Sequence, residues 1–321
     1  MKLATLQDAI LFFSDPVRCR EYMVEQRWPN GVECPRCGSK DVLFLEKYNR
    51  WHCRAKHAAP QFTLKTGTVM EDSPISLEKW MPAFWLLANC KNGISSYELH
   101  RALGVTQKTA WFMLHRIRVA FEGDAAQLGG NGGPVEIDET FVGGKVRNMH
   151  KSRRPKDASQ GGKGKAVVLG MLERGGKVRA KVIKDRSKIN VAPVMKSTIE
   201  AGAHIMTDEF SVYPFVAADT YVHEVINHAV EYVNGHIHTN GIENFWSLLK
   251  RGINGTYVAV EPFHLDSYVV EQVFRYNNRA TKDNPLTDLD RFTLAVSQIV
   301  GKRITYAELT GKVGETSAEP F

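Results

Sequence analysis

The chain has 321 residues, of which 43% are hydrophobic and 24% are charged, as expected for a globular protein of about two domains. No apolar run approaches the roughly 20 residues of a membrane helix, and the N-terminus has neither a basic start nor a small-residue cleavage site. From these features we expect a cytoplasmic protein with neither a membrane span nor a signal peptide.

The positive charge is concentrated in one part of the sequence. The formal net charge is +7, and residues 145–188 hold fifteen Lys or Arg residues against three acidic ones. A basic block of this density is typical of nucleic-acid binding, although a solvated loop without a partner has the same composition. If the block binds DNA, Arg153 and Arg154 are its expected contacts.

The first predicted domain, residues 1–75, holds an N-terminal helix and a candidate zinc ribbon. Five cysteines, unevenly spaced in a long chain, favour thiols or metal ligands over a disulfide framework. A C-x2-C pair followed by Gly38 forms one knuckle, but Lys56 occupies the position of the second pair's last cysteine. A histidine must then supply the fourth ligand, with His52 a weaker candidate than His57, and the alternative is a hairpin without metal. The predicted structural zinc ligands are Cys34, Cys37, Cys53 and His57.

Residues 76–128 predict a helix-turn-helix region. A helix at 76–92 is followed by a short one from Ser95 to Leu103, and a third helix runs from Gln107 to Phe121. A short helix, a turn that contains glycine and a longer helix, in this order, form the helix-turn-helix pattern. An ordinary helical hairpin has the same spacing. DNA contacts are expected at the start of the third helix, from Gln107, Lys108 and Thr109.

The following residues alternate strands and helices, which predicts an α/β domain with a mixed sheet at 129–300. One strand carries Asp138, and a later apolar run ends at Asp208. Between them, two β-rich runs flank Gly175-Gly176, which indicates a hairpin.

A helix at 240–251 supplies a third acid, Glu243. It places Glu243, Ser247 and Lys250 on one face, while the opposite face is apolar. Asn240 and Glu243 also have the spacing of a capping box, in which the carboxylate only satisfies a backbone N–H. Carboxylates from two strands and a helix are the hard ligands that a two-metal phosphodiester site needs. The predicted apolar face consists of Ile242, Phe245, Trp246 and Leu249.

In combination, these motifs resemble the bacterial insertion-sequence transposases of the DDE class, which join an N-terminal zinc ribbon to a ribonuclease-H-like catalytic domain of the integrase-like superfamily. The resemblance is carried by the zinc knuckles, by residues 62–68 and by residues 135–145. It continues through residues 207–209, 238–240 and 243–251.

The resemblance implies that Asp138, Asp208 and Glu243 hold two Mg²⁺ or Mn²⁺ ions, with Asn240 or Asn244 as alternatives to Glu243. It also implies that Lys250, with its neighbour Arg251, contacts DNA. The expected partners are double-stranded DNA, as terminal inverted repeats and target, and further copies of the chain in a dimer or larger assembly.

We therefore predict a DNA transposase that binds element ends, hydrolyses phosphodiester bonds and transfers strands. The alternatives are a catalytically inactive DNA-binding regulator derived from a transposase and a nuclease that cuts without joining. In the predicted domain order, 1–75, 76–128 and 129–300 are followed by a C-terminal tail at 301–321.

Overall fold

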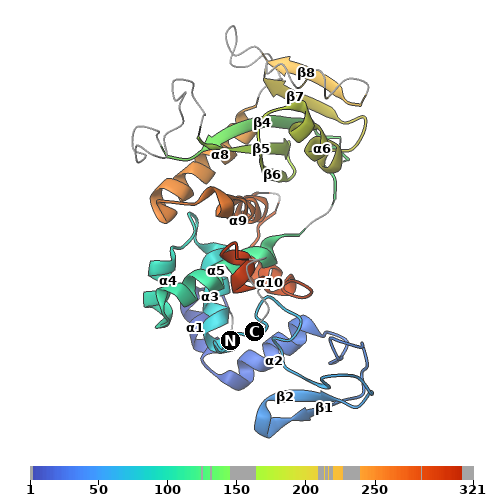
Figure 1. The fold of residues 1–321 in the computed structure, drawn as a ribbon, viewed down its shortest axis with the longest axis vertical. Helices are drawn as coiled ribbons and strands as arrows, with labels where there is room; N and C mark the ends of the chain where they lie inside the picture. The colour runs from blue at the N-terminus through green and yellow to red at the C-terminus, as the bar shows by residue number, and fades with distance from the viewer. Residues whose placement is uncertain are drawn as a thin grey trace, which may run out of the picture. The chain divides into compact units, whose positions relative to one another are not determined.

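In the computed structural model, the chain divides into two compact units, which Figure 1 shows as a ribbon. One unit combines residues 1–123 with 280–321, and the other comprises residues 124–279. The structure describes residues 3–123, 126–130, 132–144, 164–208, 213, 216, 220–226, 239–282 and 284–312.

Two helices open the first unit. Helix α1 (Leu6–Phe13) begins with a capping box between Thr5 and Asp8. Helix α2 (Pro16–Arg27) begins with Pro16 in its first turn, and the Asp15 carboxylate accepts from the next backbone N–H groups. The predicted single N-terminal helix is therefore two, because the second has its own cap and proline start.

A three-stranded antiparallel sheet follows, in the order β1 (Val42–Leu45), β2 (Arg50–Cys53) and β3 (Gln61–Phe62). Trp51 of β2 and Phe62 of β3 are stacked with ring centroids 5.9 Å apart, and Trp28 packs edge-on against both. This small apolar cluster supports the hairpin that carries Cys53.

Helices α3 (Leu77–Asn89), α4 (Ser96–Leu103) and α5 (Gln107–Phe121) form the helical part of the unit. The predicted capping box of α4, between Ser95 and Glu98, is present. Gly104 ends α4 with φ of 60°, a left-handed conformation that glycine adopts without steric cost. Thr106 is the N-cap of helix α5, and its hydroxyl accepts a hydrogen bond from the backbone N–H of Thr109.

The C-terminal residues fold with these helices. Helix α10 (Asp288–Ser297) places Phe292 against Phe13 and Trp85, at centroid distances of 5.4 and 5.3 Å. The N–H of Val69 donates to the carbonyl of Ile299. The predicted limits of 129–300 for the α/β domain and 301–321 for a tail differ from this division, because apolar packing ties residues 288–299 to the N-terminal helices. A short helix, α11 (Tyr306–Leu309), lies within the range predicted as tail.

The second unit is built on a mixed sheet of five strands in the order β6-β5-β4-β7-β8. Strand β5 runs antiparallel to β4 and β6, while β7 is parallel to β4 and β8 is parallel to β7. The first strand in sequence therefore lies at the centre. The strands are β4 (Val135–Val142), β5 (Ala166–Glu173), β6 (Val178–Ile183), β7 (His204–Asp208) and β8 (Val222–Ile226).

Helices cover both faces of this sheet. Helix α6 (Lys188–Thr198) contributes Val191 and Met195 to the core on one face. Helices α8 (Asn240–Gly252) and α9 (Leu265–Asn277) pack on the other face, with a π-helical turn at Ile253–Tyr257 after α8. The multidomain prediction, with a zinc ribbon and a mixed α/β sheet, agrees with this architecture.

No helix among the described residues is long and apolar enough to span a membrane.

Candidate functional site

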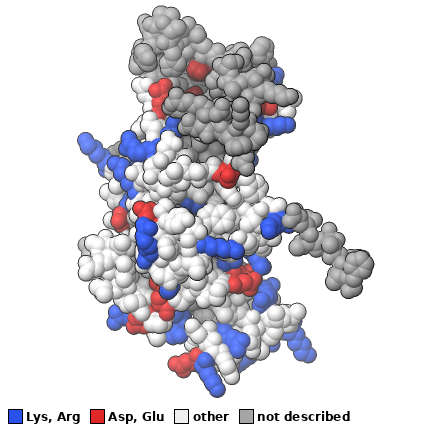
Figure 2. All heavy atoms as spheres, turned by 60° about the vertical axis from the view of Figure 1, so that its left-hand side comes forward, with Lys and Arg blue, Asp and Glu red and all other residues white. Residues whose placement is uncertain are grey.

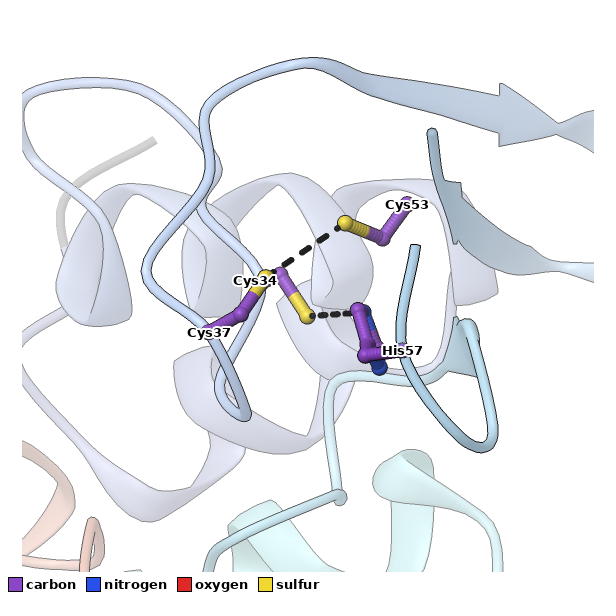
Figure 3. A group of neighbouring side chains, drawn as sticks. All are labelled: Cys34, Cys37, Cys53 and His57. Carbon is purple, nitrogen blue, oxygen red and sulfur yellow. Dashed lines mark hydrogen bonds between the residues drawn. The ribbon is translucent and has the colours of Figure 1, made fainter. Parts of the chain in front are cut away.

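The structure brings the four predicted zinc ligands together (Figure 3). Their ligand atoms all lie within 4.8 Å of one another, with 3.5 Å from the Cys34 sulfur to Nε2 of His57 and 3.6 Å between the sulfurs of Cys37 and Cys53. Zn–S bonds of about 2.3 Å and Zn–N bonds of about 2.1 Å in a tetrahedron place ligand atoms about 3.6–3.8 Å apart. The cluster therefore fits a zinc ion.

The fourth ligand is the histidine of the loop after β2. The ring Nδ1 of His57 donates to the carbonyl oxygen of Ala58 at 2.7 Å, which leaves Nε2 as the nitrogen that faces the cysteines. His52, the weaker candidate, pairs with Leu43 and Gln61 in the sheet and is not part of the cluster. Four protein ligands leave no open position, as in structural zinc sites.

Backbone amides favour the charged form of one ligand. Burial by itself raises the pKa of the Cys34 thiol, but the N–H groups of Arg36 and Cys37 donate to its sulfur. Together with the neighbouring thiols, they lower the pKa of Cys34 to about 7. Zinc binds the thiolate form of cysteine, so the lowered pKa of Cys34 favours metal binding.

In the second unit, Asp138 and Asp208 lie on neighbouring parallel strands. Ile137 of β4 pairs with Thr207 of β7, so each aspartate follows a paired residue by one position. Side chains at the same register of adjacent strands share a face, and this face is the one that α8 covers. The two carboxylates therefore lie on the same face, one position beyond the last paired residues of β4 and β7.

Helix α8 holds Asp138 through its tryptophan. The indole Nε1–H of Trp246 donates to Oδ2 of Asp138 at 2.8 Å. Burial raises the pKa of Asp138 to about 6, and the negative charges of Glu139 and Asp208 add to the increase, while the Trp246 hydrogen bond opposes it. A largely desolvated carboxyl group near other negative charges is a place where a cation relieves repulsion.

A glycine makes this contact possible. Gly170 of β5 pairs with Asp138, and a Cβ atom at Gly170 would lie 2.5 Å from the Trp246 ring and 2.9 Å from Ile242. Such distances are well inside van der Waals contact. Only glycine at this position lets α8 approach the sheet closely enough for Trp246 to reach Asp138.

A buried glutamate fixes the start of the same helix. One carboxylate oxygen of Glu136 accepts from the backbone N–H of Ile242 at 2.9 Å, and the other accepts from Nε of Arg174 at 2.8 Å. Glu136 is 1% exposed, so this anchor lies inside the unit and complements the positive end of the helix dipole. It replaces a side-chain cap, since the residue before α8, Thr239, makes no capping bond to the backbone.

The capping-box interpretation of Asn240 and Glu243 is wrong. Asn240 is the first residue of α8 rather than its cap, and the Glu243 carboxylate accepts from the Thr239 hydroxyl at 3.2 Å. The predicted apolar face is correct: Ile242, Phe245, Trp246 and Leu249 are all buried.

The third predicted acid, Glu243, does not form a cluster with Asp138 and Asp208 in this structure. Within the described ranges, no group of three or more His, Cys, Asp or Glu ligand atoms other than the Cys₃His cluster lies within 4.8 Å. Glu243 is exposed on α8, as are Asn240 and Asn244. All three candidates for the third position thus lie on the outer side of the helix, together with Lys250.

Glu139, the residue after Asp138, points to the opposite face of the sheet. It accepts from the Tyr213 hydroxyl at 2.5 Å and from Arg186 at 3.0 Å. Burial, followed by the charge of Glu139, raises the pKa of Tyr213, so this hydroxyl remains a proton donor. The sequence analysis missed Glu136 and Glu139, whose only signal was their place in the same strand as Asp138.

The predicted DNA contacts of α5 have internal partners. The Gln107 amide donates to the Ser96 hydroxyl at 2.8 Å, and the Lys108 ammonium lies 4.6 Å from the ring centroid of Tyr306. The Thr109 hydroxyl lies 2.8 Å from that of Thr106.

Lys250 and Arg251 are exposed at the end of α8, whereas Arg153 and Arg154 fall outside the described residues. On the face that Figure 2 shows, Lys and Arg side chains are scattered among acidic ones.

A cysteine–histidine zinc ribbon joined to an acid-bearing α/β unit is a combination that DNA-processing proteins use. Family models match both parts: a transposase zinc-ribbon domain at residues 15–55 and an ISXO2-like transposase domain at residues 129–277. A protein of Halobacterium salinarum, described as an uncharacterized protein in transposable element ISH50, is 29% identical over 250 residues. That match covers 74% of this chain and 83% of the relative.

The two matched segments make up more than half of the chain, and both models are of transposase domains. The chain therefore contains a transposase zinc-ribbon domain and an ISXO2-like transposase domain, which is consistent with an insertion-sequence transposase.

Proposed function

We propose that this protein is a DNA transposase of the DDE class. The unit of residues 124–279 would be a ribonuclease-H-like catalytic domain, which hydrolyses phosphodiester bonds at the element's ends and joins the freed 3′-hydroxyl to target DNA. A mixed five-stranded sheet with the first strand at its centre supports this assignment. Such a protein works on chromosomal DNA, so we expect it in the cytoplasm and on the nucleoid when bound.

The observation that carries the proposal is the pair of aspartates at neighbouring positions of two parallel strands, Asp138 within β4 and Asp208 at the end of β7. Asp138 and Asp208 share the face under α8, and mutual repulsion contributes to the raised pKa of Asp138. Carboxylate oxygens are the ligands that Mg²⁺ and Mn²⁺ prefer, so the donor set fits these ions. Bound there, two such ions supply activation of the attacking oxygen and stabilisation of the leaving oxygen.

The remaining residues position the DNA and complete the site. Glu243, or Asn240 or Asn244 in its place, would supply the third ligand from α8, and Lys250 lies two turns further along the same helix. The zinc ribbon and the α4–α5 pair would bind the terminal inverted repeats. Since two element ends must be held together for strand transfer, the active form would be a dimer or larger.

The test is an incubation of the purified full-length protein with Mg²⁺ and duplexes that carry the terminal repeats flanking its gene. We expect nicks at the repeat ends and joined products, both lost in Asp138→Asn and Asp208→Asn. Glu200→Gln, which alters an exposed acid of the same unit, is the matched control and should cut normally. Binding without cuts would instead support a regulator, and nicks without joined products a nuclease.

The third ligand is identified by a second comparison. Glu243→Gln, Asn240→Ala and Asn244→Ala are each assayed for cutting and for Mn²⁺ binding. The variant that loses both as fully as Asp138→Asn marks the residue that reaches the metal. If all three cut like the parent, the third position is not on this turn of α8.

A further inference from the structure

A pocket of about 220 Å³ opens beside the first turns of α5. It lies within the unit of residues 1–123 and 280–321, and it is separate from both the zinc cluster and the acidic site. Its lining includes three aromatic side chains and two cations, namely Trp80, Phe112, Tyr306, Lys108 and Arg116. At roughly 30 Å³ per water, the volume corresponds to roughly seven water molecules, which leaves room for a small planar ligand.

The aromatic walls face the pocket from different elements. Phe112 of α5 and Tyr306 of α11 meet edge to face, with centroids 5.7 Å apart. Trp80 of α3 is 1% exposed and its indole N–H donates to the Ser73 hydroxyl at 3.3 Å, so it forms a fixed inner wall. Tyr306 is 40% exposed and lies at the surface. Flat apolar surfaces in this arrangement suit a planar ring that enters from solvent.

Two cations flank these rings. The Arg116 guanidinium lies 4.4 Å from the centroid of Phe112, and its NH1 donates to the carbonyl of Glu71 at 2.9 Å. Its Nε is buried and has no hydrogen-bond partner among the residues that the structure describes, and Arg116 is only 6% exposed. The Lys108 ammonium lies 4.6 Å from the centroid of the Tyr306 ring. The acid in the lining, Asp72, is already paired with Arg303 at 2.8 Å.

The position of the pocket restricts its ligand further. From Met113 onward α5 is largely buried, so only its first turns are accessible to a partner. Lys108 and Thr109, two of the predicted DNA contacts, belong to these turns and line the pocket. Aromatic faces with adjacent cations at a nucleic-acid contact surface are the elements from which proteins build base-stacking sites.

We propose that this pocket holds one unstacked nucleobase of the bound DNA, with the base against Phe112 and Tyr306 and its phosphate beside Lys108. The inference rests on the proposed function in taking DNA as the ligand, and it adds that the protein recognises an unpaired base. A free nucleotide offers the same chemistry, so the test has to separate the two sources.

The experiment uses the full-length, zinc-loaded protein and two fluorescein-labelled duplexes of the same unrelated sequence, one fully paired and one with a single bulged base. Stacking of one base on an aromatic side chain corresponds to about five- to a hundredfold in affinity, and we expect the bulged duplex to bind more tightly by this factor. With 2-aminopurine as the bulged base, binding should quench its fluorescence. Free dAMP is the competitor that tests the second source.

Phe112→Leu and Tyr306→Leu should each remove the preference and the quenching while binding to the paired duplex persists. Tyr97→Leu, which alters a 62% exposed tyrosine of α4 outside the pocket, is the matched control and should keep both. Equal affinity for the two duplexes, or a preference that survives both pocket variants, overturns the inference. Competition by dAMP at concentrations comparable to the bulged duplex assigns the pocket to free nucleotides instead. If neither these duplexes nor a duplex that carries the terminal repeats binds, the proposed function itself fails, whereas binding of the repeats alone overturns only the inference.

Discussion

The hydrogen bond from Trp246 to Asp138 predicts how the proposed metal binding at Asp138 depends on pH. Trp246→Phe removes the indole N–H but keeps an aromatic ring against the sheet. A hydrogen bond to a charged group contributes about 1.5–3 kcal/mol, and each 1.4 kcal/mol is tenfold in an ionisation equilibrium. The carboxyl of Asp138 in the variant should therefore ionise about ten- to a hundredfold less readily than in the parent.

The consequence at neutral pH follows from the pKa of Asp138, which is about 6 in the parent. At pH 7, about nine-tenths of this carboxyl is ionised in the parent, and between about a half and a tenth in the variant. Since the proton competes with the cation, the apparent affinity for Mn²⁺ should fall about two- to tenfold at pH 7. At pH 8.5 the variant is again mostly ionised, and its affinity should approach that of the parent.

The assay is a Mn²⁺ titration followed by electron paramagnetic resonance at pH 6.5, 7 and 8.5. Trp85→Phe, at a buried tryptophan of the other unit, is the matched control and should leave all three affinities unchanged. An affinity that is the same in Trp246→Phe and the parent at pH 7, or a loss that persists at pH 8.5, would refute the reasoning.

Three further predictions concern metal content and stability. His57→Ala should lose bound zinc by elemental analysis and melt at a lower temperature, because the cluster keeps only three ligands, while His52→Ala should retain zinc. Gly170→Ala should lower the free energy of unfolding by about 1–3 kcal/mol in denaturant titrations, because the new Cβ displaces Trp246. An unchanged midpoint would contradict the close approach of α8. Glu136→Gln should destabilise by about 1–3 kcal/mol, since its buried charge faces a helix N-terminus; equal thermal melts would show that the charge is dispensable.

Local spacing in the sequence determined several features without reference to the fold. The C-x2-C knuckle, the apolar face of α8 and the strands that carry Asp138 and Asp208 are where the sequence analysis placed them. Each of these features depends on neighbours within a few residues, because ligand spacing and helical or strand periodicity are properties of a short stretch of chain.

Only the tertiary structure decided which polar residues are buried and what they contact. Glu136 has the same alternating position as an exposed strand residue, yet α8 covers it, because β4 is a central strand with helices on both faces. The choice of His57 over His52 depends on which ring the hairpin turns toward the cysteines.

The packing of the C-terminal residues could not be predicted from the local sequence either. Phe292 packs against aromatic residues that lie more than two hundred positions earlier, a contact that no local pattern encodes. The sequence by itself thus specified the elements and their apolar faces, which are set by short-range periodicity. Only the tertiary structure decided how those faces pack together, how closely α8 approaches Gly170 and how Glu136 anchors the start of α8. Each of these features is a contact between segments that are far apart in the sequence.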